Sequence, residues 1–314
     1  MNFKKRILIT GGAGNIAGAL ATKLSEIDDY QIVIVDNLST GDISKLPDLR
    51  RPNIKFIKLD VNDLNAISTV MCSEQFDLVF HYAAVVGVQR TLAHPMLVLA
   101  DIEGIKNILE LSKNTGVGRV VFSSSSEVYG EPFEIPQNEN TTPLNSRLPY
   151  AVVKNVGETF FRSYFREYSL AFNIFRFFNT YGPNQSEDFV LPRFIDAALM
   201  NKPLTVHGAG DQTRTFCYID DNTETTVRIA ESLEYENSTI NIGSDHEISI
   251  INLAKLVIEL ARSTSEIIHL PALTEGDMTR RCPDNSLMKD VLGRDLVSLE
   301  EGILKLVVHK KALL

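Results

Sequence analysis

Tyr150 and Lys154 are the residues of this chain whose types and spacing most directly suggest chemistry. They lie four residues apart in the segment Pro-Tyr-Ala-Val-Val-Lys, and residues four apart share one face of a helix. The Lys154 ammonium is therefore expected beside the Tyr150 phenol, where its charge favours phenolate and lowers a pKa that is ordinarily about 10. Such a tyrosine can take a proton from an alcohol or sugar hydroxyl while hydride leaves the adjoining carbon. An ordinary amphipathic helix can have the same spacing, so the neighbouring motifs must decide whether this pair is catalytic.

A glycine-rich turn near the start of the chain predicts a phosphate site. The apolar run 7–10 leads into Gly12-x-Gly14-x-x-Ala17 and then into a helical pattern. A strand that enters glycines and a helix N-terminus directs backbone N–H groups and the helix dipole toward an anion. The spacing fits the dinucleotide fingerprint, which permits alanine at its last position.

Asp36 supports the same interpretation. It ends a second apolar run, 31–36, about 20 residues after the glycines. Its carboxylate can accept hydrogen bonds from the adenosine ribose and would repel the additional phosphate of NADP, so NAD is the expected cofactor. The alternative is that Asp36 is only a polar strand end.

The composition excludes several classes of protein. The 314 residues are 44% hydrophobic and carry a net charge of -9, which argues against a nucleic-acid or anionic membrane surface. Cys72, Cys217 and Cys282 lie far apart and the six histidines are scattered, so neither a metal site nor a disulfide framework is expected. The first apolar run is too short for a signal peptide or membrane span, which predicts a soluble, cytoplasmic protein.

The order of apolar runs predicts an α/β fold. Strand-like segments at 54–59, 78–80, 119–122 and 172–177 alternate with helical patterns at 64–71, 95–112 and 150–168. This alternation predicts a Rossmann-type, doubly wound parallel sheet. Ligands gather at the carboxyl ends of such strands. The residues expected there are Gly11, Asp36, Asp60, His81 and Ser123.

The regular alternation ends near residue 179, where prolines begin to separate shorter elements. We therefore predict two domains, an NAD-binding domain over 1–178 and a smaller C-terminal α/β substrate lobe over 179–314. Part of 215–240 is expected to rejoin the first domain. The substrate should bind in the cleft between them.

Ordered motifs now show a family resemblance over almost the whole chain. They are T-G-G-A-G-N-I-A (10–17), V-D-N-L-S-T-G (35–41), L-D-V (59–61), H-Y-A-A (81–84), S-S-S-E-V-Y-G (124–130), Y-A-V-V-K (150–154), R-F-F-N-T-Y-G-P (176–183), G-D-Q-T-R-T-F-C-Y-I-D-D (210–221) and N-I-G (241–243). The chain resembles the extended short-chain dehydrogenases/reductases that act as nucleotide-sugar epimerases, dehydratases and decarboxylases. The family typically has a bulky apolar residue at Asn15 and glycine at Ala17, where an additional methyl group would approach the cofactor.

The resemblance implies a role for each matching residue. Tyr150 would be the base, with Lys154 and Ser125 assisting at the reacting hydroxyl. The implied NAD-binding residues are Gly11, Gly14, Asn15, Ile16, Ala17, Asp36, Asn37, Asp60, Val61, Tyr82, Ala83, Ala84, Ser123, Tyr150 and Lys154. The implied residues for the nucleotide-diphosphate sugar are Arg90, Asn179, Arg193, Val206, His207, Arg214 and Arg281. For Arg193 and Arg281, an ordinary surface charge is an equal alternative.

Glu127 bears on which reaction is catalysed. All members of the family first oxidise the 4-hydroxyl of the sugar. A 4-epimerase, our leading expectation, then only turns the ketone over and needs no further acid or base. A UDP-glucuronate decarboxylase or an NDP-hexose 4,6-dehydratase would use Glu127, which could instead be a solvated loop charge.

Other expectations stay open at this level. A dehydrogenase that releases NADH, or a non-catalytic NAD-binding scaffold or sensor, would share most of these motifs. The resemblance also implies a homodimer in which segments 95–112 and 150–168 of each copy form a four-helix bundle. The nucleotide and the sugar are not determined by the sequence.

Overall fold

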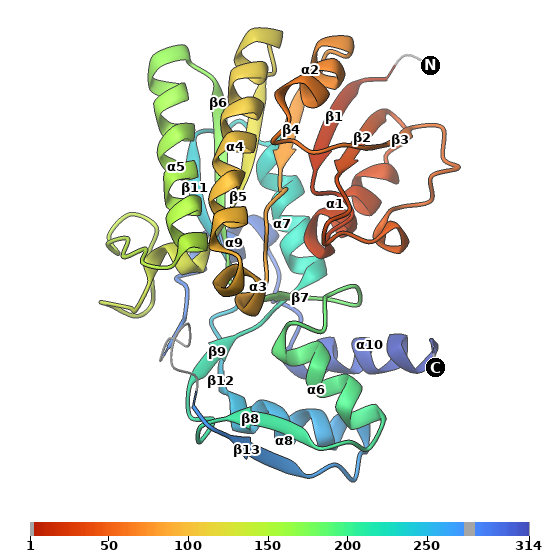
Figure 1. Cartoon of the computed structure of the whole chain (residues 1–314), viewed down its shortest axis with the longest axis vertical. Helices are drawn as coiled ribbons and strands as arrows, with labels where there is room; N and C mark the ends of the chain where they lie inside the picture. The colour runs from red at the N-terminus through yellow and green to blue at the C-terminus, as the bar shows by residue number, and fades with distance from the viewer. Residues whose placement is uncertain (1–2, 273–279, 314) are drawn as a thin grey trace.

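A seven-stranded parallel sheet forms the larger part of the computed structural model, which describes residues 3–272 and 280–313 (Figure 1). Its strand order is β11-β6-β5-β4-β1-β2-β3. The strands are β1 (Lys5–Thr10), β2 (Tyr30–Asp36), β3 (Ile54–Lys58), β4 (Leu78–His81), β5 (Arg119–Ser125), β6 (Ala171–Phe177) and β11 (Ser238–Ile242). The prediction of a Rossmann-type doubly wound sheet is confirmed.

Helices cover both faces of this sheet. One face carries α2 (Leu64–Ser73), α4 (Pro95–Thr115) and α5 (Pro149–Tyr168), and the other carries α1 (Asn15–Ser25), α7 (Ile219–Glu231) and α9 (Ser286–Leu292). The central strands β1, β2, β4 and β5 contain continuous apolar runs, as expected where both faces are covered. Two separate apolar cores result, one on each side of the sheet.

The remaining elements pack below the carboxyl edge of the sheet in Figure 1. Helices α6 (Val190–Leu199), α8 (Ile250–Ala261) and α10 (Leu299–Lys311) form a third apolar core with the parallel pair β8 (Leu204–His207) and β13 (Ile267–Leu270). The shorter elements are η1 (Ile43–Lys45), α3 (Val88–Ala93), η2 (Ser126–Tyr129), β7 (Thr180–Tyr181), β9 (Thr213–Thr215), β10 (Cys217–Tyr218) and β12 (Glu247–Ser249).

Local sequence signals set several helix ends. The side chains of Ser249 and Ser298 accept hydrogen bonds from Asn252 N and Glu301 N, as expected for N-caps. Asp63 caps α2 in the same way. Helix α4 ends at Gly116, which has φ +77° and so adopts the left-handed conformation that favours glycine.

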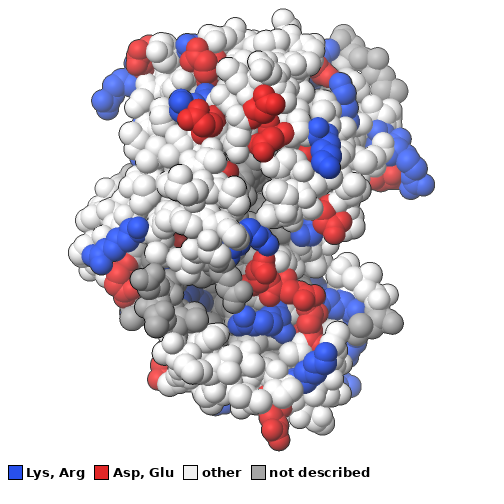
Figure 2. Space-filling view, viewed as in Figure 1, with Lys and Arg blue, Asp and Glu red and all other residues white. Residues whose placement is uncertain are grey.

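The outer surface carries no membrane-spanning element in the described ranges, where no helix is long and apolar enough to cross a bilayer. On the face shown in Figure 2, basic and acidic side chains are interspersed.

A buried ion pair joins α5 to β6. The Arg176 guanidinium donates to both Glu158 carboxylate oxygens at 2.8 and 2.7 Å, and neither side chain is more than 2% exposed. Ser124 Oγ donates to Glu158 at 2.7 Å, and Arg176 Nη1 donates to Tyr129 Oη at 2.7 Å. The pair is therefore part of a network that extends from β5 to η2.

We expect Glu158→Ala to lower the free energy of unfolding by about 3–5 kcal/mol, because it leaves the Arg176 charge buried without its carboxylate. Chemical denaturation followed by circular dichroism measures the loss. Glu103→Ala is the matched control, since Glu103 pairs with Lys106 on the exposed side of α4 and such pairs contribute about 1 kcal/mol or less. Equal effects of the two substitutions would contradict this account.

Candidate active site

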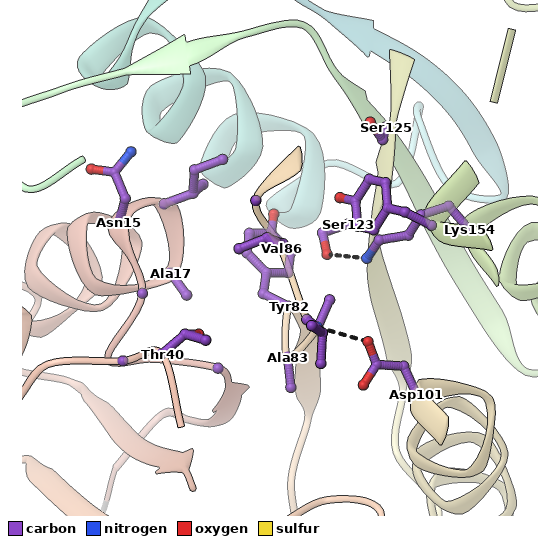
Figure 3. Close-up of a pocket in the computed structure, with 18 of the residues that line it drawn as sticks. Asn15, Ala17, Thr40, Tyr82, Ala83, Val86, Asp101, Ser123, Ser125 and Lys154 are labelled. Carbon is purple, nitrogen blue, oxygen red and sulfur yellow. Dashed lines mark hydrogen bonds between the residues drawn. The ribbon is translucent and has the colours of Figure 1, made fainter. Parts of the chain in front are cut away.

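A cavity of about 620 Å³ lies at the carboxyl edge of the sheet. The ends of β1, β2, β4 and β5, the start of α5 and the segment around Arg281 contribute to its walls. In Figure 3, Asn15, Ala17 and Thr40 lie on one side of this cavity, and Ser123, Ser125 and Lys154 lie on the other. The cavity is thus long enough to reach from the glycine turn to the predicted catalytic residues.

The glycine turn forms a close-fitting backbone cradle. Gly11 has φ +70°, and a Cβ added there would come within 2.7 Å of the Ala83 main chain. Helix α1 begins at Asn15 with no acidic residue in its first turn, so its positive end is not neutralised locally. Ala17 is 3% exposed and packs into the core below the turn as well as lining the cavity. These features fit a bound pyrophosphate.

Asp36 lies at the end of β2 beside this cradle. Its carboxylate accepts hydrogen bonds from Ala13 N at 3.0 Å and Leu38 N at 2.7 Å. Further along, Asn37 Nδ2 donates to Asp60 Oδ2 at 3.1 Å, and both residues line the cavity. The carboxylate and amide groups expected for the adenosine half of NAD therefore stand on adjacent strand ends, which fits the cofactor.

Tyr150 and Lys154 occupy the first two turns of α5 on the face that lines the cavity. Lys154 Nζ donates to Ser123 Oγ at 3.3 Å, drawn as a dashed line in Figure 3. The same nitrogen lies 5.7 Å from the centre of the Tyr150 ring. The spacing therefore brings the two side chains to one place, as the sequence predicts.

The electrostatics of this pair differ from the expectation. Removal from water and the negative charge of Glu127 raise the pKa of Tyr150, although the Ser125 hydroxyl opposes the shift by a hydrogen bond. Burial also lowers the pKa of Lys154 to about 8. The expected depression of the tyrosine pKa by lysine is wrong for the protein alone, because removal from water is the largest effect on both groups.

Glu127 is the second residue of the short helix η2, which directly follows β5. Its backbone N donates to Ser125 Oγ at 3.2 Å, which fixes the serine beside it. Its carboxylate lies 3.6 Å from Arg281 Nη1, and the two side chains are 20% and 7% exposed. Glu127 therefore faces the cavity in contact with a cation, which argues against a solvated loop charge.

His81 lies under this end of the site and is 1% exposed. Its Nδ1 is 2.9 Å from Thr10 Oγ1, and Thr10 Oγ1 accepts hydrogen bonds from the backbone N–H groups of Tyr82 and Ala83. Burial, followed by the charge of Lys154, lowers the pKa of His81 to about 3. His81 is thus neutral near pH 7 and supports the cavity wall.

The cavity collects most of the residues that the sequence predicts. All the predicted catalytic and cofactor residues line it, as do Asn179 and Arg281 of the predicted substrate residues. Arg90, Arg193, Val206, His207 and Arg214 are not among its lining residues.

The outlying residues have different surroundings. Arg90 pairs with Asp188 at 3.2 Å, and His207 Nδ1 is 3.0 Å from the Pro271 carbonyl. Val206 is 1% exposed and belongs to the third core. Arg193 Nε is buried and has no hydrogen-bond partner within the ranges that the structure describes. A buried guanidinium N–H without a partner favours a ligand that accepts its hydrogen bond, such as an anion.

The sequence did not identify several residues that line the cavity. They include Thr40, Val85, Val86, Gly87, Asp101 and Phe189. Asp101 accepts a hydrogen bond from Val85 N at 2.7 Å. Its helix contains no motif that marks this carboxylate, because the packing of α4 on α2 and α5 decides which residue faces the cavity.

With this geometry in view, we compared the chain with known proteins. The profile of the NAD dependent epimerase/dehydratase family matches residues 7–243. The chain belongs to this family. NAD is accordingly its cofactor, and the family's enzymes act on nucleotide sugars.

Individual relatives differ in the reaction they catalyse. The chain is 35% identical over 307 residues to UDP-glucuronic acid decarboxylase 3 of Arabidopsis thaliana, covering 95% of this chain and 86% of the relative. It is also 35% identical to a UDP-N-acetyl-alpha-D-glucosaminuronate decarboxylase of Bacillus cytotoxicus, with 96% of each protein covered. A UDP-glucose 4-epimerase structure from Thermotoga maritima, with UDP-glucose, superposes with a TM-score of 0.91 at 30% identity over 98% and 99% of the two chains. These matches agree on the family but do not decide between decarboxylation and 4-epimerisation.

Proposed function

We propose that this enzyme decarboxylates a nucleotide-linked hexuronate by way of a transient 4-ketone. The observation that carries the proposal is the contact between Glu127 and Arg281 beside Tyr150. A 4-epimerase requires no second carboxylate at this position. The geometry therefore favours decarboxylation over the 4-epimerisation that the sequence leads us to expect. Two of the relatives described above are named as hexuronate decarboxylases, which supports the proposal.

The first step is oxidation at carbon 4. Tyr150 takes the proton of the 4-hydroxyl, and Ser125 holds the same oxygen by a hydrogen bond. The glycine turn, Asp36 and Lys154 would hold NAD, which would supply the acceptor for the hydride of carbon 4 and the donor for its return. Lys154 supplies positive charge beside the phenolate that forms.

The second step follows from the chemistry of the ketone. A hexuronate oxidised at carbon 4 is a β-keto acid, so the bond between carbons 5 and 6 breaks and carbon dioxide leaves. The electron pair moves into an enolate whose oxygen accepts hydrogen bonds from Ser125 and the protonated Tyr150. A proton then replaces carbon dioxide at carbon 5, and the ketone is reduced again.

The position of Arg281 favours a substrate that carries a carboxylate. A substrate carboxylate beside Glu127 alone would be repelled, and the Arg281 guanidinium offsets that repulsion. This differs from the diphosphate role that the resemblance implies for Arg281. We keep that diphosphate role for Arg193, whose buried Nε fits an anion.

Dehydration fits the site less well. Elimination of the 6-hydroxyl needs a base at carbon 5 and an acid for the departing oxygen. The residue before Glu127 is Ser126, which is buried and is not an acid at neutral pH.

The second candidate remains 4-epimerisation, which the likeness to the Thermotoga maritima epimerase favours.

The purified enzyme with NAD should convert UDP-glucuronate or UDP-N-acetylglucosaminuronate to a product lighter by carbon dioxide. Mass spectrometry and proton NMR would follow a panel of UDP-, GDP- and dTDP-linked hexoses and hexuronates. An unchanged mass with inverted carbon 4 would replace the proposal with epimerisation, and loss of water would replace it with dehydration. Tyr150→Phe is the control that should remove every one of these activities while leaving NAD bound.

Arg281→Met should reduce kcat/KM for the hexuronate by about 10–100-fold, the value of one charged hydrogen bond of about 1.5–3 kcal/mol. The neighbouring Arg280 offers the control, because it is half exposed and pairs with Glu247 away from the cavity. Arg280→Met should retain activity within about threefold. Equal losses for hexuronate and neutral hexose with Arg281→Met would instead assign this residue to the diphosphate.

We also propose that two copies pair through the outer faces of α4 and α5. These helices pack on each other and expose Met96, Leu99, Phe165 and Tyr168, which are apolar or aromatic. A groove lined by Phe160 and Tyr164 adjoins them. Analytical ultracentrifugation should give twice the chain mass, and Phe165→Glu should shift the enzyme toward the monomer, whereas a monomeric wild type would end the proposal.

A further inference from the structure

Asp101 is a half-buried carboxylate that lines the active-site cavity and that the mechanism above does not use. It lies on α4, which packs against α5, the helix that carries Lys154. Its Oδ2 accepts the Val85 N–H at 2.7 Å, and in Figure 3 it points toward the loop that follows β4. This loop, residues 85–87, forms part of the cavity wall.

We propose that Asp101 is a positioning residue for hydride transfer, which holds the Val85 main chain in the cavity wall and places a negative charge in the cavity that Lys154 and Tyr150 also line. The inference rests on the proposed roles of Tyr150 and Lys154. It does not depend on whether the product is decarboxylated or epimerised.

The surroundings of Lys154 explain why a carboxylate matters there. Within residues 3–272 and 280–313, Lys154 Nζ contacts the Ser123 hydroxyl at 3.3 Å and the rings of Phe122 and Tyr150, and none of these groups is an anion in the resting enzyme. His81 lies below it on β4 and is neutral. Burial lowers the pKa of Lys154, and the Asp101 charge raises it in opposition to that larger effect.

Asp101 itself is held by its own neighbours. Burial raises its pKa, while the hydrogen bond from Val85, the Lys154 charge and the Asn62 side chain lower it, and Asp60 adds a smaller raising effect. Asn62 also accepts the Gly104 N–H at 2.9 Å, which ties this group to the middle of α4. The contacts that hold the loop 85–87 in the cavity wall therefore also hold the Asp101 carboxylate in place.

The sign of the pH effect follows from these contacts. The Asp101 charge raises the pKa of Lys154 and also that of Tyr150, which responds as well to Glu127 and Arg281. Activity that needs protonated Lys154 is lost as pH rises through the lysine pKa, so removing the Asp101 charge moves this loss to lower pH. The tyrosine pKa falls in the same variant, so the acid side of the profile moves in the same direction.

Two substitutions separate the two roles. Asp101→Asn keeps an oxygen for the Val85 N–H and removes the charge, whereas Asp101→Ala removes both. Glu103→Gln, on the exposed side of the same helix, removes a carboxylate away from the cavity. Circular dichroism checks that each variant is folded.

The decisive measurement is NMR of enzyme labelled with ¹³C at lysine Cε, without NAD or substrate, with Lys154→Met to assign the signal. We expect the Lys154 midpoint to move below its wild-type value in Asp101→Asn and to stay in place in Glu103→Gln. In turnover, Asp101→Asn should move both limbs of the pH profile to lower pH, and Asp101→Ala should in addition raise the KM for NAD.

An unmoved Lys154 midpoint in folded Asp101→Asn would overturn the electrostatic role. Equal KM values for NAD in the two Asp101 variants would overturn the role of the Val85 contact. Failure of the decarboxylase proposal leaves the lysine titration unaffected, because that titration is read without a nucleotide sugar.

Discussion

The buried ion pair between Glu158 and Arg176 is the contact on which the arrangement of the active site depends. Glu158 stands one turn after Lys154 on α5, so the pair fixes the helix that carries both Tyr150 and Lys154. Through Ser124 it also fixes the end of β5, where Ser123 and Ser125 lie on either side. Two independent chain segments thus approach the reacting hydroxyl with their relative positions set by one carboxylate.

The same network extends to the substrate side of the cavity. Arg176 reaches Tyr129, whose hydroxyl donates to Asn241 Oδ1 at 2.8 Å, and Asn241 Nδ2 donates to the Gln137 carbonyl at 2.8 Å. Gln137 in turn pairs through its main chain with the segment that follows Arg281. A buried ion pair is weak evidence of net stability, but here it connects the residues that must act together.

Charges of alternating sign surround the cavity end where Tyr150 lies. Asp101, Lys154, Glu127 and Arg281 come from four different segments, and each is partly or wholly removed from water. In such surroundings burial dominates the pKa values, which is why lysine and tyrosine shift in the directions that disfavour their charged forms. The chemistry of the site therefore depends on where the carboxylates lie as well as on the tyrosine and lysine that the motif displays.

The sequence by itself determined the sheet, the glycine cradle and the placing of Tyr150 and Lys154 on one helix face. These depend on local patterns: apolar runs with the period of strands and helices, glycines where the backbone approaches closely, and a spacing of four on one helix. The tertiary structure alone decided that Glu127 meets Arg281, more than 150 positions later in the chain, and that Asp101 rather than another residue of α4 faces the cavity. It also decided the direction of the tyrosine and lysine pKa shifts. Such contacts join segments remote in sequence, and burial is a property of the packed protein, so neither leaves a local pattern from which it can be predicted.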